Sequence, residues 1–229
     1  MSFIEESVYF GIILSLLAYG MGCAIKSKFK KALFNPLLIS IAITIAVLVV
    51  SGIDYETYNE GANILTWLLT PATVCLAVPL YEKIGLLKDN CKATFAGITT
   101  GVLTSLVCIL LMEILFGFTH EEYITFLPKS ITTAIGIGVS EEMGGYTELT
   151  AAIIIITGVV GNVIAPFICK VGKITEPIAK GIAIGTSAHA VGTARALEMG
   201  ETEGAMSSLS IGVAGILTVI GASIFAQFM

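Results

Sequence analysis

Residues 185–200 concentrate side chains that could bind an anion. This stretch contains Arg195, the only arginine in the 229-residue sequence, among small and apolar residues. A cation close to hydrocarbon is costly and needs a partner or a function. The glycines and hydroxyls around this cation predict an interrupted helix that lines a cavity. The alternative is that Arg195 extends to a membrane interface and that the glycines only allow close helix packing.

Residues 127–145 form a second segment of this kind, because a lysine, hydroxyls and glycines occur in a stretch too short and too polar to cross a membrane. Protein or water must satisfy such a backbone at membrane depth, so we predict a re-entrant segment. Arginine binds a carboxylate through two parallel hydrogen bonds, and half-helix N-termini add a positive field. We therefore predict a small organic anion as ligand, with a 2-hydroxy or 2-oxo group that suits hydroxyl donors. The predicted binding residues are Lys129, Ser130, Thr132, Thr133, Thr186, Ser187, His189, Thr193 and Arg195.

Structural roles are the alternatives for several of these residues. Lys129 could be an ordinary headgroup lysine at a helix end. His189 could be a hydrogen-bonded core histidine, although its usual pKa range would also suit proton coupling. Glu198 lies three residues after Arg195, so it could pair with it on one helical face and hold it without contact to a ligand.

The elements that position these residues must be membrane helices. Apolar residues make up 55% of the chain and charged residues 13%, against about 25% charged residues in a soluble domain. Stretches without charge reach the ~20 residues that cross hydrocarbon as a helix. They comprise residues 61–81, 93–112, 149–169 and 205–229, with shorter ones at 7–25 and 32–53. We predict an all-α integral membrane protein of the cell membrane, with about seven transmembrane helices plus one re-entrant segment.

Other function classes have no candidate site in the sequence. There is no Walker loop, no Cys/His metal spacing and no nucleophile elbow, so we expect no enzyme, no metal site, no cofactor and no nucleic-acid partner. The five cysteines show no paired spacing and are typical of small core residues. Glu5 and Glu6 replace a positive n-region, so no cleavable signal peptide is expected.

The distribution of lysines predicts the topology. By the positive-inside rule, the three loops that carry them face the cytoplasm, and the acidic loops between them face outward. The N-terminus is then outside and the C-terminus inside. The lysines of these loops are Lys26, Lys28, Lys30 and Lys31, then Lys83, Lys88 and Lys92, then Lys170, Lys173 and Lys180.

Weak internal similarity indicates a repeat within a single transmembrane domain, residues 1–229. A shift of 115 residues aligns residues 71–85 with 186–200, and each half, residues 36–118 and 147–229, then reads as span, broken helix, span. A shift of 56 residues aligns part of residues 127–145 with part of 185–200. With the lysine loops inside, the two halves have opposite orientations. Inverted repeats with broken helices are typical of secondary transporters, although glycine and proline are also common in transmembrane helices.

Five ordered motifs resemble the LrgB/CidB family, also written as the YohK group. They are NPLL at Asn35, YETYNEG at Tyr55, PATVCLAVPLY at Pro71, LPKSITT at Leu127 and GTSAHAVGTARALEMGETEGAMSSL at Gly185. From these motifs we assign supporting roles to Asn35, Pro71, Thr73 and Glu198. The chain departs from the family pattern at Ala134 and at residues 190–192, where backbone flexibility changes and the donors stay.

The resemblance implies two functions. One is an antiholin-like regulator of murein hydrolase export and autolysis that works with a small LrgA- or CidA-type membrane protein. The other is transport, because some members are similar to the plastid glycolate/glycerate transporter and to pyruvate carriers. We expect a gradient-driven carrier for a small 2-oxo or 2-hydroxy monocarboxylate, with the regulator as alternative. The expected partners are that anion, the LrgA-type protein and the lipid bilayer, and a homo-oligomer is left open.

Overall fold

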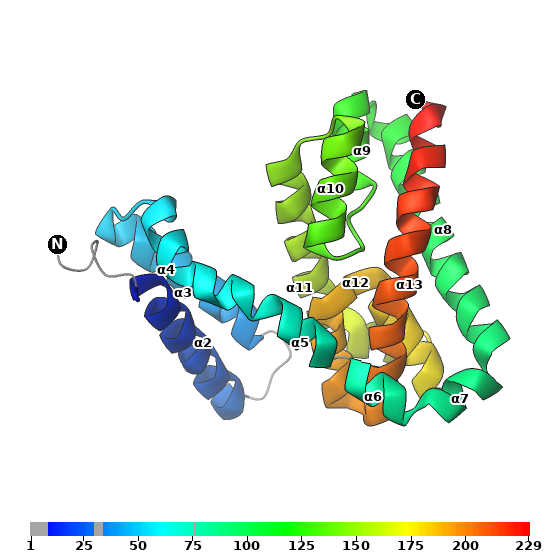
Figure 1. The fold of residues 1–229 in the computed structure, drawn as a ribbon, viewed down its shortest axis with the longest axis horizontal. Coiled ribbons are helices and arrows are strands. Elements are labelled where there is room, and N and C mark those ends of the chain that lie inside the picture. The colour runs from blue at the N-terminus through cyan, green and yellow to red at the C-terminus, as the bar shows by residue number, and fades with distance from the viewer. Residues whose placement is uncertain (1–8, 30–33, 76) are drawn as a thin grey trace. The chain divides into compact units, whose positions relative to one another are not determined.

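The computed structural model describes residues 9–29, 34–75 and 77–229, in which every regular element is a helix. The chain divides into unit 1, residues 1–75, and unit 2, residues 76–229 (Figure 1). Glu5, Glu6, Lys30 and Lys31 lie outside the described residues. The predicted all-α class is confirmed, whereas one domain over the whole chain stays a prediction.

Unit 1 is built on close contacts of its first helix. Its helices are α2 (Phe10–Phe29), α3 (Pro36–Ser51), α4 (Tyr55–Trp67) and α5 (Leu69–Cys75). Ser15 of α2 and Tyr58 of α4 share a hydrogen bond of 2.7 Å between their hydroxyls. The side chain of Asn35 caps α3 by accepting a hydrogen bond from the Leu37 amide at 2.8 Å. Asn35 therefore has a structural role that its residue type favours.

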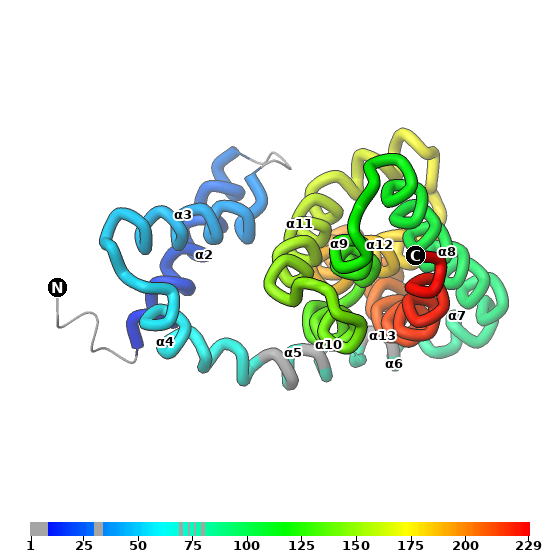
Figure 2. Tube along the Cα trace, turned by 90° about the horizontal axis from the view of Figure 1, so that it is seen from above, coloured from blue at the N-terminus to red at the C-terminus, as the bar shows by residue number. Residues whose placement is uncertain are grey.

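Unit 2 consists of long helices and shorter helical pieces. They are α6 (Ala77–Glu82), α7 (Ile84–Asp89), α8 (Cys91–Phe116), α9 (His120–Phe126), α10 (Thr133–Met143), α11 (Thr147–Val171), α12 (Pro177–Met199) and α13 (Glu201–Phe225). The core lies along one stripe of α8, where Ile98, Val102, Leu106 and Ile109 are buried at helical spacing. Seen from above, α9 and α12 lie between α11 on one side and α8 and α13 on the other (Figure 2).

Four helices among the described residues are long and apolar enough to cross a membrane, namely α2, α8, α11 and the stretch Glu201–Phe228. They confirm a multi-pass helical membrane protein. The predicted number of seven crossings is not confirmed. Residues 61–81 are divided among α4, α5 and α6, as expected of a span that contains Pro71 and Pro79 and is therefore predicted to be broken.

Residues 120–143 form a first helical hairpin, made of α9, a turn at residues 127–132 and α10. The hairpin returns to the end of unit 2 at which it starts. A hydrogen bond of 2.9 Å from the Tyr146 amide, just after α10, to the Thr125 hydroxyl of α9 shows this return. The Thr150 hydroxyl donates to the Thr125 carbonyl at 3.1 Å, which ties the start of α11 to the same point. A re-entrant segment requires this geometry, and its insertion to membrane depth stays a prediction.

Helix α12 forms a second hairpin, because its backbone leaves helical geometry at Ala188 (φ −133°, ψ 16°) and His189 (φ 41°, ψ −141°). The first half runs in the same direction as α13. Lys180 lies beside Glu203, with 3.8 Å between Nζ and Oε1. Five residues later, a Cβ at Gly185 would lie 2.8 Å from Ser210 Cβ.

The second half of α12 runs back along the same part of α13. The Thr193 and Ser207 hydroxyls share a hydrogen bond of 2.7 Å. Four residues later, a Cβ at Gly204 would lie 2.9 Å from Leu197 Cγ. Residues 185–200 are thus interrupted, as predicted, but they turn back instead of crossing.

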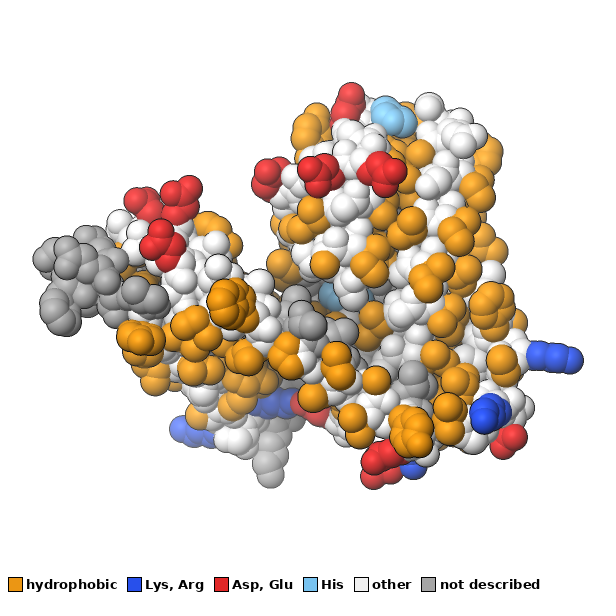
Figure 3. All heavy atoms as spheres, viewed as in Figure 1, with side chains coloured by type: hydrophobic (Ala, Val, Ile, Leu, Met, Phe, Trp, Pro, Cys, Tyr) orange, Lys and Arg blue, Asp and Glu red, His pale blue; other side chains and the backbone are white. Residues whose placement is uncertain are grey.

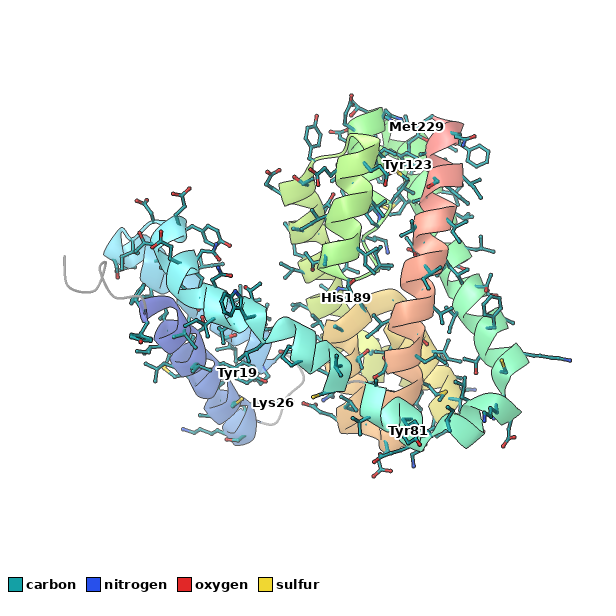
Figure 4. The ribbon with its side chains drawn as sticks, in the orientation of Figure 1. Tyr19, Lys26, Tyr81, Tyr123, His189 and Met229 are labelled. Carbon is teal, nitrogen blue, oxygen red and sulfur yellow. The ribbon has the colours of Figure 1, made fainter. Side chains whose placement is uncertain are left out.

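This turn moves the C-terminus to the other end of unit 2. Helix α13 starts at the lysine-bearing end, where Lys83 and Glu201 form an ion pair of 3.1 Å. It finishes at the opposite end, where the Tyr123 hydroxyl donates to the Phe225 carbonyl at 3.2 Å. Figure 4 shows Tyr123 and Met229 at one end and Tyr81 at the other. The prediction that the C-terminus lies on the side of the lysine loops is therefore wrong.

Lysines concentrate at one end of unit 2. In the space-filling view, acidic side chains gather at the end that carries α9, whereas lysines and acidic side chains both appear at the end that carries α7 (Figure 3). The positive-inside rule therefore predicts that the α7 end faces the cytoplasm and that the α9 end, with the C-terminus, faces outward.

The element bounds in unit 2 follow the shift of 56 residues. Helices α8 and α11 begin at Cys91 and Thr147, and α10 and α12 end at Met143 and Met199. Each pair is 56 residues apart. A span followed by a hairpin therefore occurs twice, entered from opposite ends, while the longer repeat of residues 36–118 and 147–229 stays a prediction.

Cysteine labelling tests this topology in a cysteine-free background. We expect a cysteine at Lys173 to react only with a membrane-impermeant reagent from the cytoplasmic side. Cysteines at Glu121 and Phe228 should react only from outside, because both residues lie at the α9 end. Labelling of positions 173 and 228 from the same side would show that α12 crosses the membrane and would contradict the hairpin.

Candidate functional site

The tips of the two hairpins meet at the middle of α8 and α11. On α8, the Ser105 hydroxyl lies 3.2 Å from that of Ser130, at the tip of the first hairpin. One turn earlier, a Cβ at Gly101 would lie 3.0 Å from Thr186 Oγ1, at the tip of the second hairpin. On α11, Ile154 packs directly against Gly136 of α10. Hairpins that enter unit 2 from opposite ends thus converge on one level.

His189 fixes the tip of the second hairpin. Its side chain is buried, and Nε2 lies 3.0 Å from the Ile154 carbonyl oxygen. Because a carbonyl only accepts, Nε2 must carry the proton. The positive φ of His189 costs of order 1–3 kcal/mol in a non-glycine residue, so the packing around the ring has to hold it. Figure 4 shows His189 midway between the two ends of unit 2. These contacts favour the hypothesis of a hydrogen-bonded core histidine.

A cavity of about 520 Å³ lies beside the tips, between α11 and the first half of α12. Lys129 from the first hairpin and Ser187 from the second both line it. The Lys129 ammonium donates a hydrogen bond to the Ser130 hydroxyl at 2.9 Å. The N-terminus of α10 begins at this tip, so its free amides add to the positive field. Two residues that the sequence singled out separately are therefore brought to one cavity.

Most of the hydroxyls that were predicted to donate to a ligand already form hydrogen bonds within the protein. Thr186 donates to the Ile182 carbonyl at 2.7 Å, and Ser187 donates to the Ala183 carbonyl at 2.7 Å. Thr193 is within 3.0 Å of the His189 carbonyl. A hydroxyl has one proton to donate, so Thr186 and Ser187 present only acceptor lone pairs to a ligand. Thr132 and Thr133 are half-buried at the start of α10.

Arg195 forms an ion pair with Glu198, at 2.5 Å between Nη1 and Oε2. This is the pairing on one helical face that the sequence offered as alternative. Arg195 does not line the cavity of Lys129 and Ser187, and its Nε is buried without a hydrogen-bond partner. A role of Arg195 in binding a carboxylate stays a prediction.

A second cavity of about 420 Å³ adjoins the first at the lysine end, because Cys169 and Ile174 line both. Its lining includes Lys170, Lys173 and Lys180. Lysines around an opening raise the local concentration of anions. An anion that approaches from this end would meet these lysines before it reached Lys129.

Comparisons with known proteins identify the family. The model of the LrgB-like family matches residues 15–228. The chain belongs to the LrgB family. The antiholin-like protein LrgB of Bacillus subtilis is 37% identical over 224 residues, which cover 97% of each chain. The antiholin-like proteins LrgB of Bacillus mycoides and Bacillus cereus are 35% and 34% identical over 222 residues, or 96% of each chain. No solved structure matches.

The names of these LrgB relatives agree with the alternative function, the antiholin-like regulator, and do not mention a carboxylate. The resemblance itself is confirmed over nearly the whole chain. Two of the supporting residues of this LrgB-family chain, Asn35 and Pro71, lie in unit 1, and the side chain of Thr73 lies outside the described residues.

The contribution of α11 to the candidate site was not predicted from the sequence. Thr157 and Gly161 line the cavity, and Asn162 donates a hydrogen bond to the Val191 carbonyl at 2.6 Å. Asparagine in an otherwise apolar span was the available signal, because such a side chain needs a partner within the membrane. The same span has enough apolar residues for an ordinary crossing, so its apolar pattern alone does not indicate a site.

Proposed function

We propose that this LrgB-family protein carries a small organic anion, a 2-oxo or 2-hydroxy monocarboxylate, across the cell membrane along a gradient. The observation that supports this proposal is the meeting of two hairpin tips at one cavity, with Lys129 and Ser187 in its lining. Discontinuous helices that meet halfway are a common construction of binding sites in secondary transporters. Non-helical backbone at such a level is tolerated where it borders protein or a water-filled cavity.

The second candidate is an antiholin-like regulator. Relatives that share 96–97% of their length with this chain carry that name, so the comparisons favour this candidate over transport of a specific carboxylate. Both candidates include an LrgA- or CidA-type membrane protein as partner. They differ in whether the cavity has to bind a ligand.

Uptake and binding distinguish the two candidates. The carrier should move labelled pyruvate, glycolate or glycerate into proteoliposomes, with the chain alone or together with an LrgA-type protein. One of these acids should also stabilise the purified chain, by about 2.7 kcal/mol at a hundredfold excess over its dissociation constant. Absence of both uptake and stabilisation, with the partner present, would contradict the carrier and leave the antiholin-like regulator.

The pair of Arg195 and Glu198 is tested by a double-mutant cycle. Because the two side chains are 24% and 48% exposed, the pair should contribute about 1 kcal/mol or less. We expect Arg195→Gln to lower thermal stability, and Arg195→Gln with Glu198→Gln to recover much of the loss. If Arg195 instead binds the substrate carboxylate, both variants should lose uptake equally and the second substitution should restore nothing.

A further inference from the structure

The cavity at the hairpin tips is strongly asymmetric. Its polar side chains are Lys129 and Ser187, from the tips, and Thr157 on α11. The remaining lining is mainly aliphatic and includes Ile156, Val160, Ile164, Ile168, Ile174 and Ile184. Among the described residues of this lining, Lys129 is the one with a charged side chain. The lining thus offers one cationic group and a long apolar wall.

The apolar wall extends away from the cation. Along α11 it runs from Thr157, near the level of the tips, to Cys169, near the lysine end. At a rise of 1.5 Å per helical residue, the twelve steps between these two residues span about 18 Å. The volume of about 520 Å³ lies within the usual range of roughly 300–1,000 Å³ for small-molecule sites. An acid of two or three carbons at Lys129 would leave most of this wall without contact.

The chemistry of the wall favours a particular ligand. Apolar surface gains free energy when it leaves water, whereas a polar group in apolar surroundings loses free energy unless it finds a hydrogen bond. Beyond the tips the wall offers few such partners. The Ser187 proton is engaged by the Ala183 carbonyl, which leaves that hydroxyl only as an acceptor.

We infer that the cavity selects a monocarboxylate with an aliphatic chain of several carbons, whose carboxylate binds at Lys129 and whose chain lies along α11. This inference rests on the proposed function of the cavity as a carboxylate site and narrows its substrate class. It places 2-oxo or 2-hydroxy acids with aliphatic side chains of several carbons before small hydrophilic acids such as glycerate.

A chain-length series tests this inference on the unmodified protein in lipid nanodiscs. Binding of acetate, propionate, butanoate, pentanoate and hexanoate is measured at known free aqueous concentration, beside pyruvate and glycerate. From propionate to hexanoate, each methylene should tighten binding about fourfold, which corresponds to about 0.8 kcal/mol. Hexanol, which has the same chain without the charge, should bind at least tenfold more weakly than hexanoate.

A filled cavity provides the matched pair of variants. Ala165 lines the cavity and Ala152 is an exposed alanine of the same helix that does not line it. We expect Ala165→Phe to remove most of the gain from butanoate to hexanoate and to leave acetate binding unchanged. Ala152→Phe should leave the whole series as in the wild type.

The outcomes separate the inference from the function on which it rests. If pyruvate or glycerate binds and the series is flat, the carrier proposal stands and the inference is overturned. If no acid binds, both the carrier proposal and the inference are overturned. If hexanol binds as tightly as hexanoate, the cavity is a hydrocarbon site that membrane lipid can fill, and the inference is overturned as well.

Discussion

Substitution of Lys129 by glutamine is expected to weaken carboxylate binding by about ten- to hundredfold. The ammonium is the one charged group that the described part of the chain contributes to the lining of the cavity, and a hydrogen bond to a charged group contributes roughly 1.5–3 kcal/mol. Glutamine keeps a hydrogen-bond donor at this position and removes the charge. The measurement is the dissociation constant of the tightest acid, with stabilisation of the protein as a second readout.

The control for Lys129 is Lys88→Gln, which removes the same charge from an exposed position on α7. It should bind like the wild type, so that a general effect of net charge is separated from a local one. Equal affinity of Lys129→Gln and the wild type would remove this lysine from the site.

A single methyl group at Gly158 is expected to disturb the tip of the second hairpin. A Cβ there would lie 2.7 Å from the ring of His189 and 3.0 Å from Val191 Cβ. Real Cβ contacts are longer, so the ring has to move and its hydrogen bond to Ile154 is lost. Overpacking of this kind costs typically 1–3 kcal/mol. Gly158→Ala should therefore lower thermal stability and reduce ligand binding.

Two further variants make the Gly158 result specific. Gly138→Ala is the matched control, because a Cβ at Gly138 meets no atom within 4 Å and alanine favours the helix. Gly158→Ala combined with His189→Ser should be less destabilised than the sum of the two single variants, since the smaller side chain makes room for the methyl group. Strict additivity would show that the contact between Gly158 and His189 does not hold the tip.

The sequence predicted the chemistry of the hairpins better than their direction. Glycines and hydroxyls around His189 indicate that a helix is interrupted, and the interruption lies at Ala188 and His189. The angle of the turn depends on the two backbone dihedrals of His189, which residue types do not determine when a non-glycine residue takes a positive φ. The prediction of seven crossings and of a cytoplasmic C-terminus assumes that the interrupted helix continues across the membrane.

Residue types also do not determine which of the two cations, Lys129 or Arg195, lines the cavity. Arg195 is the only arginine of the sequence, and the spacing of three residues also predicts its pairing with Glu198, which the structure contains. Whether Arg195 binds a ligand or pairs with Glu198 depends on the direction of the second half of α12. The aliphatic wall of the cavity could not be predicted from the sequence, because isoleucine and valine occur equally well in the lining of a cavity and on a surface that faces lipid.

The convergence of the two hairpins has an electrical consequence. If both enter a bilayer as proposed, neither crosses it, and the layer of protein that separates the two aqueous faces at this point is only as thick as the tips. The membrane voltage would then fall largely across that thin layer, close to Lys129. A unit charge that passes through the full potential changes in free energy by about 2.3 kcal/mol per 100 mV. The net charge moved in one passage, by the anion and by any ion bound with it, would therefore decide how strongly the cell's own voltage drives or opposes that passage.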